Sequence, residues 1–391
     1  MQTNGKKIKK VIFFTPMLDT GGMERVISDL SLNLPDSVES IIVLFADQTS
    51  YPYDFKGKII SLDLPSNNVL PLKIYYFFVG IIRLRKIIKK EKPDRVVSFG
   101  FQANIINIFS YKNNILRADV CLSSSLMNID KFLVRILFNR AYQIICVSKA
   151  VAKDLIDNFK IKEDKVRVVY NPLSIKEISA LAAEPLEPEY KNIFNSPVII
   201  NIGRIGRQKG QWYLIRAFKE AENEIKDVKL VILGVGKLES ELKQLVKNLG
   251  LESKVYFLGW QRNPFKFLAK SKIFVLSSLW EGLPCVILEA MACKLPIISV
   301  DCKSGPREII APNTDIVKVA KDIGYEEYGI LTPAFSGKKY GASDPLERSE
   351  KILKDAIVEV FRDQKIIEDL SKKSFKRAND FDISKVIKEL F

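Results

Sequence analysis

The 391-residue sequence contains no histidine. This absence excludes His-ligated metal sites, Ser-His-Asp triads and histidine general bases. Five cysteines are scattered without a Cys-x-x-Cys pair, so we expect free thiols in a reducing compartment. No uncharged apolar stretch reaches about 18 residues, and the polar, basic N-terminus lacks a signal-peptide core. We therefore expect no spanning helix, and a cytoplasmic protein that is soluble or peripheral on the inner face of the membrane.

Hydrophobic residues make up 47% of the chain and charged residues 27%, a balance typical of a globular protein. The length exceeds that of one ordinary core, which favours two domains. The net charge is +15, with more of the excess in the N-terminal half. A basic face suits nucleic acid, anionic lipid or a phosphorylated substrate, and charge alone does not choose among them.

Short apolar runs without polar alternation recur between helical patterns, which is typical of parallel sheets covered on both faces. We expect strands at Val11–Phe14, Ile41–Phe45, Arg95–Phe99, Val120–Leu122, Ile144–Val147, Val166–Val169, Val198–Ile202, Leu230–Leu233, Val255–Leu258, Ile273–Ser277 and Pro296–Val300. The pattern predicts an α/β protein with two Rossmann-like, doubly wound domains facing a central cleft. We place an N-terminal domain at 1–172, a linker at 173–192, a C-terminal domain at 193–370, and a C-terminal helix at 371–391 that can pack back on the first domain.

The most informative segment runs from Trp280 to Ala292. Glu281 precedes a Gly-Leu-Pro turn, and Glu289 lies about two turns into the apolar helix that follows. Pro284 suits the first helical position. The two carboxylates should then stand roughly 12 Å apart, about the span from the sugar to the ribose of a nucleotide sugar, and the helix start favours an anion between them. A solvated glutamate beside an amphipathic helix explains the same spacing equally well.

Glycine and basic residues follow the first strand of each expected domain. Gly21 and Gly22 open a helix, where they permit close approach of a phosphate or sugar. Arg204 leaves the strand end after Gly203, and Lys209 precedes another glycine, so the two cations could neutralise a diphosphate. A tight turn and a basic surface loop are the plain alternatives.

Two further segments carry weaker signals. Gly259 follows a later strand, where backbone groups could read a nucleobase edge. Asp380-Phe381-Asp382 matches the Asp-x-Asp pattern of metal-dependent sugar-nucleotide enzymes. Because it lies in the tail beside a helix start, we discount it and expect no metal.

The segment from Leu70 to Lys90 combines apolar and cationic helical faces. Aromatic anchors with basic flanks favour a helix lying in an anionic membrane interface. The alternative is a domain helix with a solvated basic face. The candidate membrane residues are Tyr75, Phe77, Phe78, Arg83, Arg85, Lys86, Lys89 and Lys90.

Taken together, these motifs resemble a family 4 retaining glycosyltransferase of the GT-B architecture over nearly the whole length. The motifs that carry the resemblance are Gly21 to Val26, Val147 to Val151, Tyr170-Asn171-Pro172, Gly203-Arg204 with Gln208-Lys209-Gly210, and Glu281 to Glu289. The variant Ser304 to Ile309 resembles members that build lipid-linked oligosaccharides and polysaccharides, including N-acetylgalactosaminyltransferases of bacterial protein glycosylation.

The resemblance implies roles for single residues. Arg204 and Lys209 would hold the donor diphosphate and stabilise the leaving nucleotide, which makes a metal unnecessary. Glu281 would contact the donor sugar, beside the backbone of Gly282, Leu283 and Pro284, and Glu289 would bind the ribose. The other donor-binding candidates are Gly21, Gly22, Gly203 and Gly259.

The implied reaction transfers a hexose or N-acetylhexosamine from a nucleotide sugar, UDP-linked in our expectation, to a glycan or lipid-linked glycan at the membrane. No cofactor and no nucleic-acid partner are expected. Many relatives carry a donor-contacting histidine where this chain reads Ser123-Ser124-Ser125. Two rival functions are a sugar-nucleotide 2-epimerase of the same architecture, which lacks a titrating base here, and a non-enzymatic basic module that binds nucleotides or nucleic acid.

Overall fold

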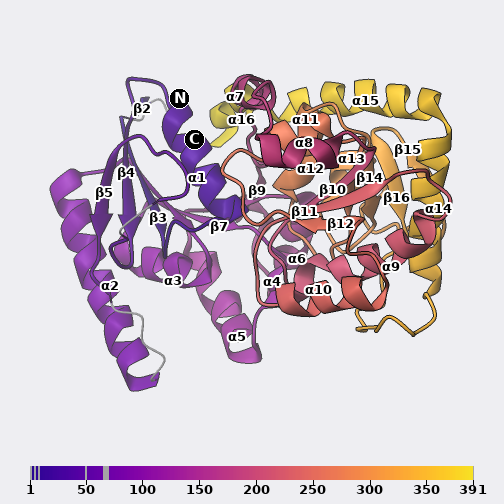
Figure 1. Cartoon of the computed structure of the whole chain (residues 1–391). Helices are drawn as coiled ribbons and strands as arrows, with labels where there is room; N and C mark the ends of the chain where they lie inside the picture. The colour runs from indigo at the N-terminus through magenta and orange to yellow at the C-terminus, as the bar shows by residue number, and fades with distance from the viewer. Residues whose placement is uncertain (1, 4–5, 8, 49–50, 65–69, 391) are drawn as a thin grey trace. The chain divides into compact units, whose positions relative to one another are not determined.

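The computed structural model describes every residue except 1, 4–5, 8, 49–50, 65–69 and 391. Contacts divide the chain into two compact units (Figure 1). Unit 1 holds Met1–Pro172 with Ile383–Phe391, and unit 2 holds Leu173–Asp382.

Unit 1 is built on a seven-stranded sheet in the order β5-β4-β3-β6-β7-β8-β9, and every neighbouring pair is parallel. In the register at its centre, Phe13 pairs with Ile42 on one side and Val97 on the other. The strands are β3 (Lys10–Thr15), β4 (Glu39–Leu44), β5 (Lys58–Ser61), β6 (Arg95–Phe99), β7 (Asn114–Ala118), β8 (Gln143–Cys146) and β9 (Val166–Val168). Strands β1 (Gln2–Thr3) and β2 (Lys6–Lys7) pair with each other alone.

Helices connect these strands. They are α1 (Gly22–Asn33), α2 (Leu70–Glu91), α3 (Phe101–Ser110), α4 (Leu122–Ser125), α5 (Asn128–Leu137) and α6 (Lys149–Phe159). Helix α16 (Ile383–Leu390) belongs to the same unit: its residues Ile383, Val386 and Ile387 are buried, and the Arg167 side chain donates to the Glu389 carbonyl.

Unit 2 has a seven-stranded sheet in the order β12-β11-β10-β13-β14-β16-β15, parallel except for the antiparallel β15–β16 pair. The strands are β10 (Val198–Ile202), β11 (Lys229–Leu233), β12 (Val255–Phe257), β13 (Ile273–Leu276), β14 (Ile297–Val300), β15 (Gly324–Glu326) and β16 (Gly329–Thr332). The helices are α7 (Ile175–Ala182), α8 (Pro188–Phe194), α9 (Gln211–Ala221), α10 (Glu239–Asn248), α11 (Phe265–Lys270), α12 (Cys285–Ala292), α13 (Pro306–Ile310), α14 (Arg348–Arg362) and α15 (Gln364–Ala378). Segment 173–192, where we expected a linker, thus carries two helices of unit 2.

One expected strand is wrong. Val120–Leu122 is the turn into α4, and the strand lies earlier, at Asn114–Ala118. Polar residues interrupt the apolar pattern of this strand. The Asn114 side chain donates to the Tyr111 carbonyl, and Arg117 is buried and forms an ion pair with Asp119 at 2.7 Å. Strands β5, β15 and β16 were not expected; they have four, three and four residues.

Candidate functional site

The two basic and acidic segments of unit 2 meet because their strands are neighbours. β10 ends at Ile202 and leads through a single 3₁₀ turn, Arg207–Lys209, into α9. β13 pairs with β10 and leads through Trp280–Pro284 into α12. Both loops leave the carboxyl edge of a parallel sheet, the place where ligands bind in such folds.

At this edge Lys209 and Glu281 form an ion pair. The Lys209 Nζ lies 2.6 Å from Glu281 Oε1, and the two side chains are only 16% and 8% exposed. Ser278 Oγ donates to the same oxygen at 2.7 Å, and Gln208 Nε2 approaches the other oxygen at 3.4 Å. The Glu281 carboxylate therefore has one charged partner, Lys209, and two neutral donors, Ser278 and Gln208.

The backbone holds the two loops in this register. Ser277 Oγ donates to the Lys209 carbonyl at 2.8 Å, and Leu279 N donates to the Gln208 carbonyl at 2.7 Å. Gly210 has φ +58°, and a Cβ there would lie 2.4 Å from the Ser277 carbonyl oxygen. Only glycine meets both demands, so the Lys209-Gly210 pair in the sequence reflects close loop packing.

The Glu281 loop is also tied to the segment after β14. Glu281 N donates to the Lys303 carbonyl at 3.4 Å, and Ser304 Oγ donates to the Glu281 carbonyl. Cys302 lies buried nearby: burial, and then the negative charge of Glu281, raise the pKa of its thiol well above the usual value, while Lys209 acts in the opposite direction. The carboxylate therefore stands in a poorly hydrated setting.

Helix α12 begins one residue later than we expected. Pro284 is its N-cap, with φ −71° and ψ 99°, and the helix starts at Cys285. Glu289 lies on this helix and is buried, so it is not the solvated surface residue of the plain alternative. Gly282, Leu283 and Pro284 are buried in the turn as well.

The remaining donor candidates of unit 2 are more open. Arg204 is exposed, and its guanidinium has no carboxylate partner among the residues that the structure describes. Gly203 packs closely against the Lys209 side chain: a Cβ on Gly203 would lie 3.0 Å from the lysine Cε and 3.2 Å from its Cδ. Gly259 has φ +70° with open space beside it, and its carbonyl accepts from Gly234 N.

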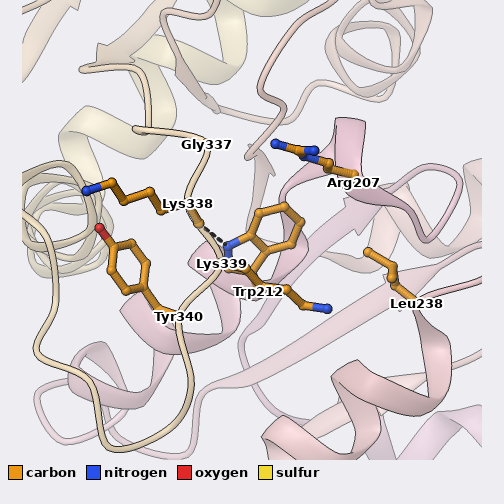
Figure 2. A pocket seen from close by; sticks show the side chains of 7 residues that line it. All are labelled: Arg207, Trp212, Leu238, Gly337, Lys338, Lys339 and Tyr340. Atoms are coloured by element: carbon orange, nitrogen blue, oxygen red, sulfur yellow. Dashed lines mark hydrogen bonds between the residues drawn. The ribbon is translucent and has the colours of Figure 1, made fainter.

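Arg207 does not join the ion pair of Lys209 and lines a separate pocket instead. Figure 2 shows this pocket and the hydrogen bond from the Trp212 indole to the Lys338 carbonyl. The pocket has a volume of about 640 Å³, and the hydrogen bond is 3.2 Å long. Its lining residues are Arg207, Trp212, Leu238, Gly337, Lys338, Lys339 and Tyr340.

In unit 1 the glycine pair opens α1 as expected, with Gly21 as N-cap and Gly22 as first residue. Glu24 is buried, and its carboxylate lies against Gly21, since a Cβ on Gly21 would fall 2.3 Å from Glu24 Oε2. Ser123 and Ser124, at the position where the resemblance implies a histidine in many relatives, are hydrogen bonded within the unit: Ser123 N and Oγ donate to Asp154, and Ser124 Oγ donates to the Cys121 carbonyl.

Helix α2 divides the membrane candidates into two groups. Phe77 packs toward the core and its ring meets Phe109, while Tyr75 and Phe78 stay exposed. The Arg83 guanidinium donates to the Leu62 and Asp63 carbonyls, and that of Arg85 to the Phe109 carbonyl. Lys86, Lys89 and Lys90 are exposed.

Sequence reasoning missed Ser278 as a member of the site. Its position directly after an apolar strand was the available signal, because the carboxyl ends of such strands carry ligand contacts. Within the described part of the chain, no group of three or more Cys, Asp or Glu residues could hold a metal ion, and Asp380 pairs with Arg377. No helix among the described residues is long and apolar enough to cross a membrane.

Comparison with known proteins identifies the family. The family profiles "Glycosyltransferase Family 4" and "Glycosyl transferases group 1" match residues 20–177 and 186–323. An uncharacterized glycosyltransferase of Methanocaldococcus jannaschii is 39% identical, over 85% of this chain and 87% of that protein. An N-acetylgalactosaminyltransferase of Campylobacter jejuni, named for a diacetylbacillosaminyl-diphospho-undecaprenol acceptor, is 30% identical over 83% and 86%.

A solved structure also shares the fold of this chain. The crystal structure of Anabaena HepE with UDP and glucose superposes with a TM-score of 0.74, covering 98% of both chains at 19% identity. The chain thus belongs to family 4 of the glycosyltransferases and has the GT-B fold.

Proposed function

We propose that this glycosyltransferase moves a hexose or N-acetylhexosamine from a UDP-linked sugar to a lipid-linked glycan, with retention of anomeric configuration and without a metal. The observation that carries the proposal is the Lys209–Glu281 contact, with Arg204 exposed in the same loop at the carboxyl edge of unit 2. The Campylobacter relative, named for a diphospho-undecaprenol acceptor, supports the lipid-linked acceptor. The UDP complex of HepE supports the nucleotide.

In the proposed reaction the donor diphosphate takes the place of Glu281 as the partner of Lys209, and Arg204 binds it from the exposed side. The bond between the anomeric carbon and the diphosphate oxygen breaks, and an acceptor hydroxyl oxygen bonds to that carbon on the same face. The hydroxyl proton passes to the leaving phosphate. Lys209 and Arg204 stabilise the charge that develops there, so no histidine base is required.

The other candidate residues have the following proposed roles. Glu281, released from Lys209 but still held by Ser278, accepts hydrogen bonds from the donor sugar. Glu289 accepts from the ribose. We assign Gly259 to contact with the base, and the backbone N–H groups at the start of α1, which Gly21 and Gly22 open, to binding of phosphate.

We also propose that α2 binds an anionic membrane from the cytoplasmic side. Its outward face carries Tyr75 and Phe78 in the first half and Lys86 and Lys89 in the second. At 3.6 residues per turn these four positions fall within a stripe of about 80°. Apolar anchors followed by cations on one face suit a headgroup region.

The activity is tested by incubating the protein with UDP-hexoses and UDP-N-acetylhexosamines and a lipid-diphosphate glycan, with UDP release and the anomeric configuration of the product as readouts. Lys209→Ala should slow turnover about 100-fold, because one pre-organised donor contributes roughly 3 kcal/mol. Lys243→Ala, which removes a surface cation of the same unit, is the matched control. Unchanged turnover in Lys209→Ala would refute the assigned role, and an epimerised nucleotide sugar without UDP release would refute the transfer.

A further inference from the structure

Helix α5 exposes an apolar stripe on the side away from its own domain. Val134 and Leu137 are buried, whereas Ile129, Phe132 and Ile136 are 64%, 59% and 47% exposed. At 3.6 residues per turn the three exposed side chains fall within about 60° of one another, centred about 135° from the buried pair. Met127, just before the helix, is 74% exposed. Four large apolar side chains within ten residues exceed the scattered exposure that is normal on a surface.

Cations border this stripe. Lys131 and Arg135 stand four residues apart, on one flank between the apolar stripe and the buried face. The N-terminal half of the chain also carries most of the +15 net charge. An apolar stripe edged by Lys and Arg complements a bilayer with anionic headgroups, because the apolar side chains reach the acyl boundary while the cations stay among phosphates.

The position of α5 links it to α2. The segment that ends in α5 leaves the sheet after β7, and the segment that ends in α2 leaves it after β5. Both strands run parallel in one sheet, so both segments leave from the same carboxyl edge. Figure 1 draws the first turns of α2 and the whole of α5 beyond the same end of unit 1. The start of α2, which carries the exposed residues Ile74, Tyr75 and Phe78, therefore lies at the same edge of the unit as α5.

We propose that α5 is a second membrane contact, in which Met127, Ile129, Phe132 and Ile136 enter the interface of a bilayer containing anionic phospholipid. Lys131 and Arg135 lie on its headgroups. This proposal rests on the proposed membrane association through α2 and deepens it. With a single helix in contact, the whole unit can pivot about that helix, whereas two contacts on one unit fix which edge faces the bilayer. Once α2 is bound, α5 is already held close to the bilayer, so its contact forms at a high effective concentration and strengthens binding.

The test compares two matched triple variants of the full chain in co-sedimentation with vesicles. Ile129→Ser/Phe132→Ser/Ile136→Ser alters α5, and Ile74→Ser/Tyr75→Ser/Phe78→Ser alters α2. Val317→Ser/Val319→Ser, which changes two exposed valines of unit 2, is the control. The vesicles contain phosphatidylglycerol and phosphatidylethanolamine, with pure phosphatidylcholine as the neutral comparison. We expect the α5 triple to bind anionic vesicles about tenfold or more weakly than the parent chain, with an unchanged melting temperature.

Each other result has a definite meaning. If the α5 triple binds like the parent while the α2 triple does not, the α5 contact is refuted and the α2 contact stands. If the α5 triple keeps its vesicle binding but changes from dimer to monomer in analytical ultracentrifugation, the stripe joins copies of this chain, and the proposal is again refuted. If neither triple alters vesicle binding, membrane association through these helices fails altogether. UDP release with a water-soluble acceptor is measured in parallel, so loss of glycosyl transfer is seen separately.

Lys131→Gln/Arg135→Gln tests the charge. We expect weaker binding to phosphatidylglycerol vesicles and unchanged binding to phosphatidylcholine vesicles, and a salt dependence smaller than that of the parent chain. Equal loss on both vesicles would show that these cations support the fold of α5 instead of binding headgroups.

Discussion

The Lys209–Glu281 pair should be energetically coupled in the absence of any ligand. The N–O distance of 2.6 Å corresponds to roughly 6 kcal/mol of attraction at an effective dielectric constant of about 20. Desolvation of both charges offsets much of this, and Ser278 continues to donate to the carboxylate when the lysine is removed. We therefore expect a coupling free energy of about 2–3 kcal/mol between the two side chains.

A double-mutant cycle measures this coupling. Lys209→Met, Glu281→Gln and the double variant are unfolded in urea, and the free energies of unfolding are compared. All three tryptophans of the chain, Trp212, Trp260 and Trp280, lie in unit 2, so their fluorescence reports the unit that contains the pair. Lys209→Met should cost more stability than the double variant, since it alone leaves a buried carboxylate without its cation.

The matched control is the Lys243–Glu239 pair on α10, with an N–O distance of 2.7 Å but side chains 56% and 30% exposed. Its cycle should give about 0.5 kcal/mol or less, because solvent screens exposed pairs. A coupling below about 0.5 kcal/mol for Lys209 and Glu281 would refute the reasoning, since the cation would then contribute nothing to holding the carboxylate.

Three further outcomes are expected. Gly210→Ala should destabilise unit 2 by more than Gly250→Ala, as followed by urea unfolding: both glycines have positive φ, at +58° and +65°, but only the first would press a Cβ against the Ser277 carbonyl. The Cys302 thiol, whose pKa is raised by burial, should stay unlabelled by a thiol reagent at pH 8 in the native protein, while half-buried Cys285 reacts faster, as mass spectrometry of peptides would show. Excess EDTA should leave the rate of UDP release unchanged; a loss restored by added Mg²⁺ or Mn²⁺ would refute the metal-free proposal.

The fold was largely predictable because its strands are continuous apolar runs. The expected strand Val11–Phe14 lies within β3, and Ile273–Ser277 extends one residue beyond β13. Both faces of the sheet are covered at these two strands. The pattern failed where a buried strand carries polar side chains, as at Asn114 and Arg117, because these residues interrupt the apolar run. Arg117, for example, is satisfied in part by Asn171, and nothing local in the sequence indicates that hydrogen bond.

The candidate site was predictable in its residues but not in its contacts. The sequence indicated that Lys209 and Glu281 both follow strands, and so both reach the carboxyl edge. It did not indicate that they touch, because that depends on β10 lying beside β13 although two other strands separate them along the chain. Nor did it indicate the exposed stripe of α5, because burial on the sheet and exposure to solvent produce the same helical spacing.

The contact changes how the donor site should be understood. A free Lys209 would be an uncompensated cation in a poorly hydrated place, whereas in the pair Glu281 compensates the charge of Lys209. In the proposed function the donor must displace Glu281 from the lysine, and the displaced carboxylate then needs new hydrogen-bond donors, since Ser278 and Gln208 satisfy only part of it. Sugar hydroxyls supply them, but a bare nucleotide diphosphate does not. On the proposed function, we therefore expect the pair to favour the intact nucleotide sugar over the nucleotide product, because only the ligand that bears a sugar offers hydrogen-bond donors to the displaced carboxylate as well as negative charge to Lys209.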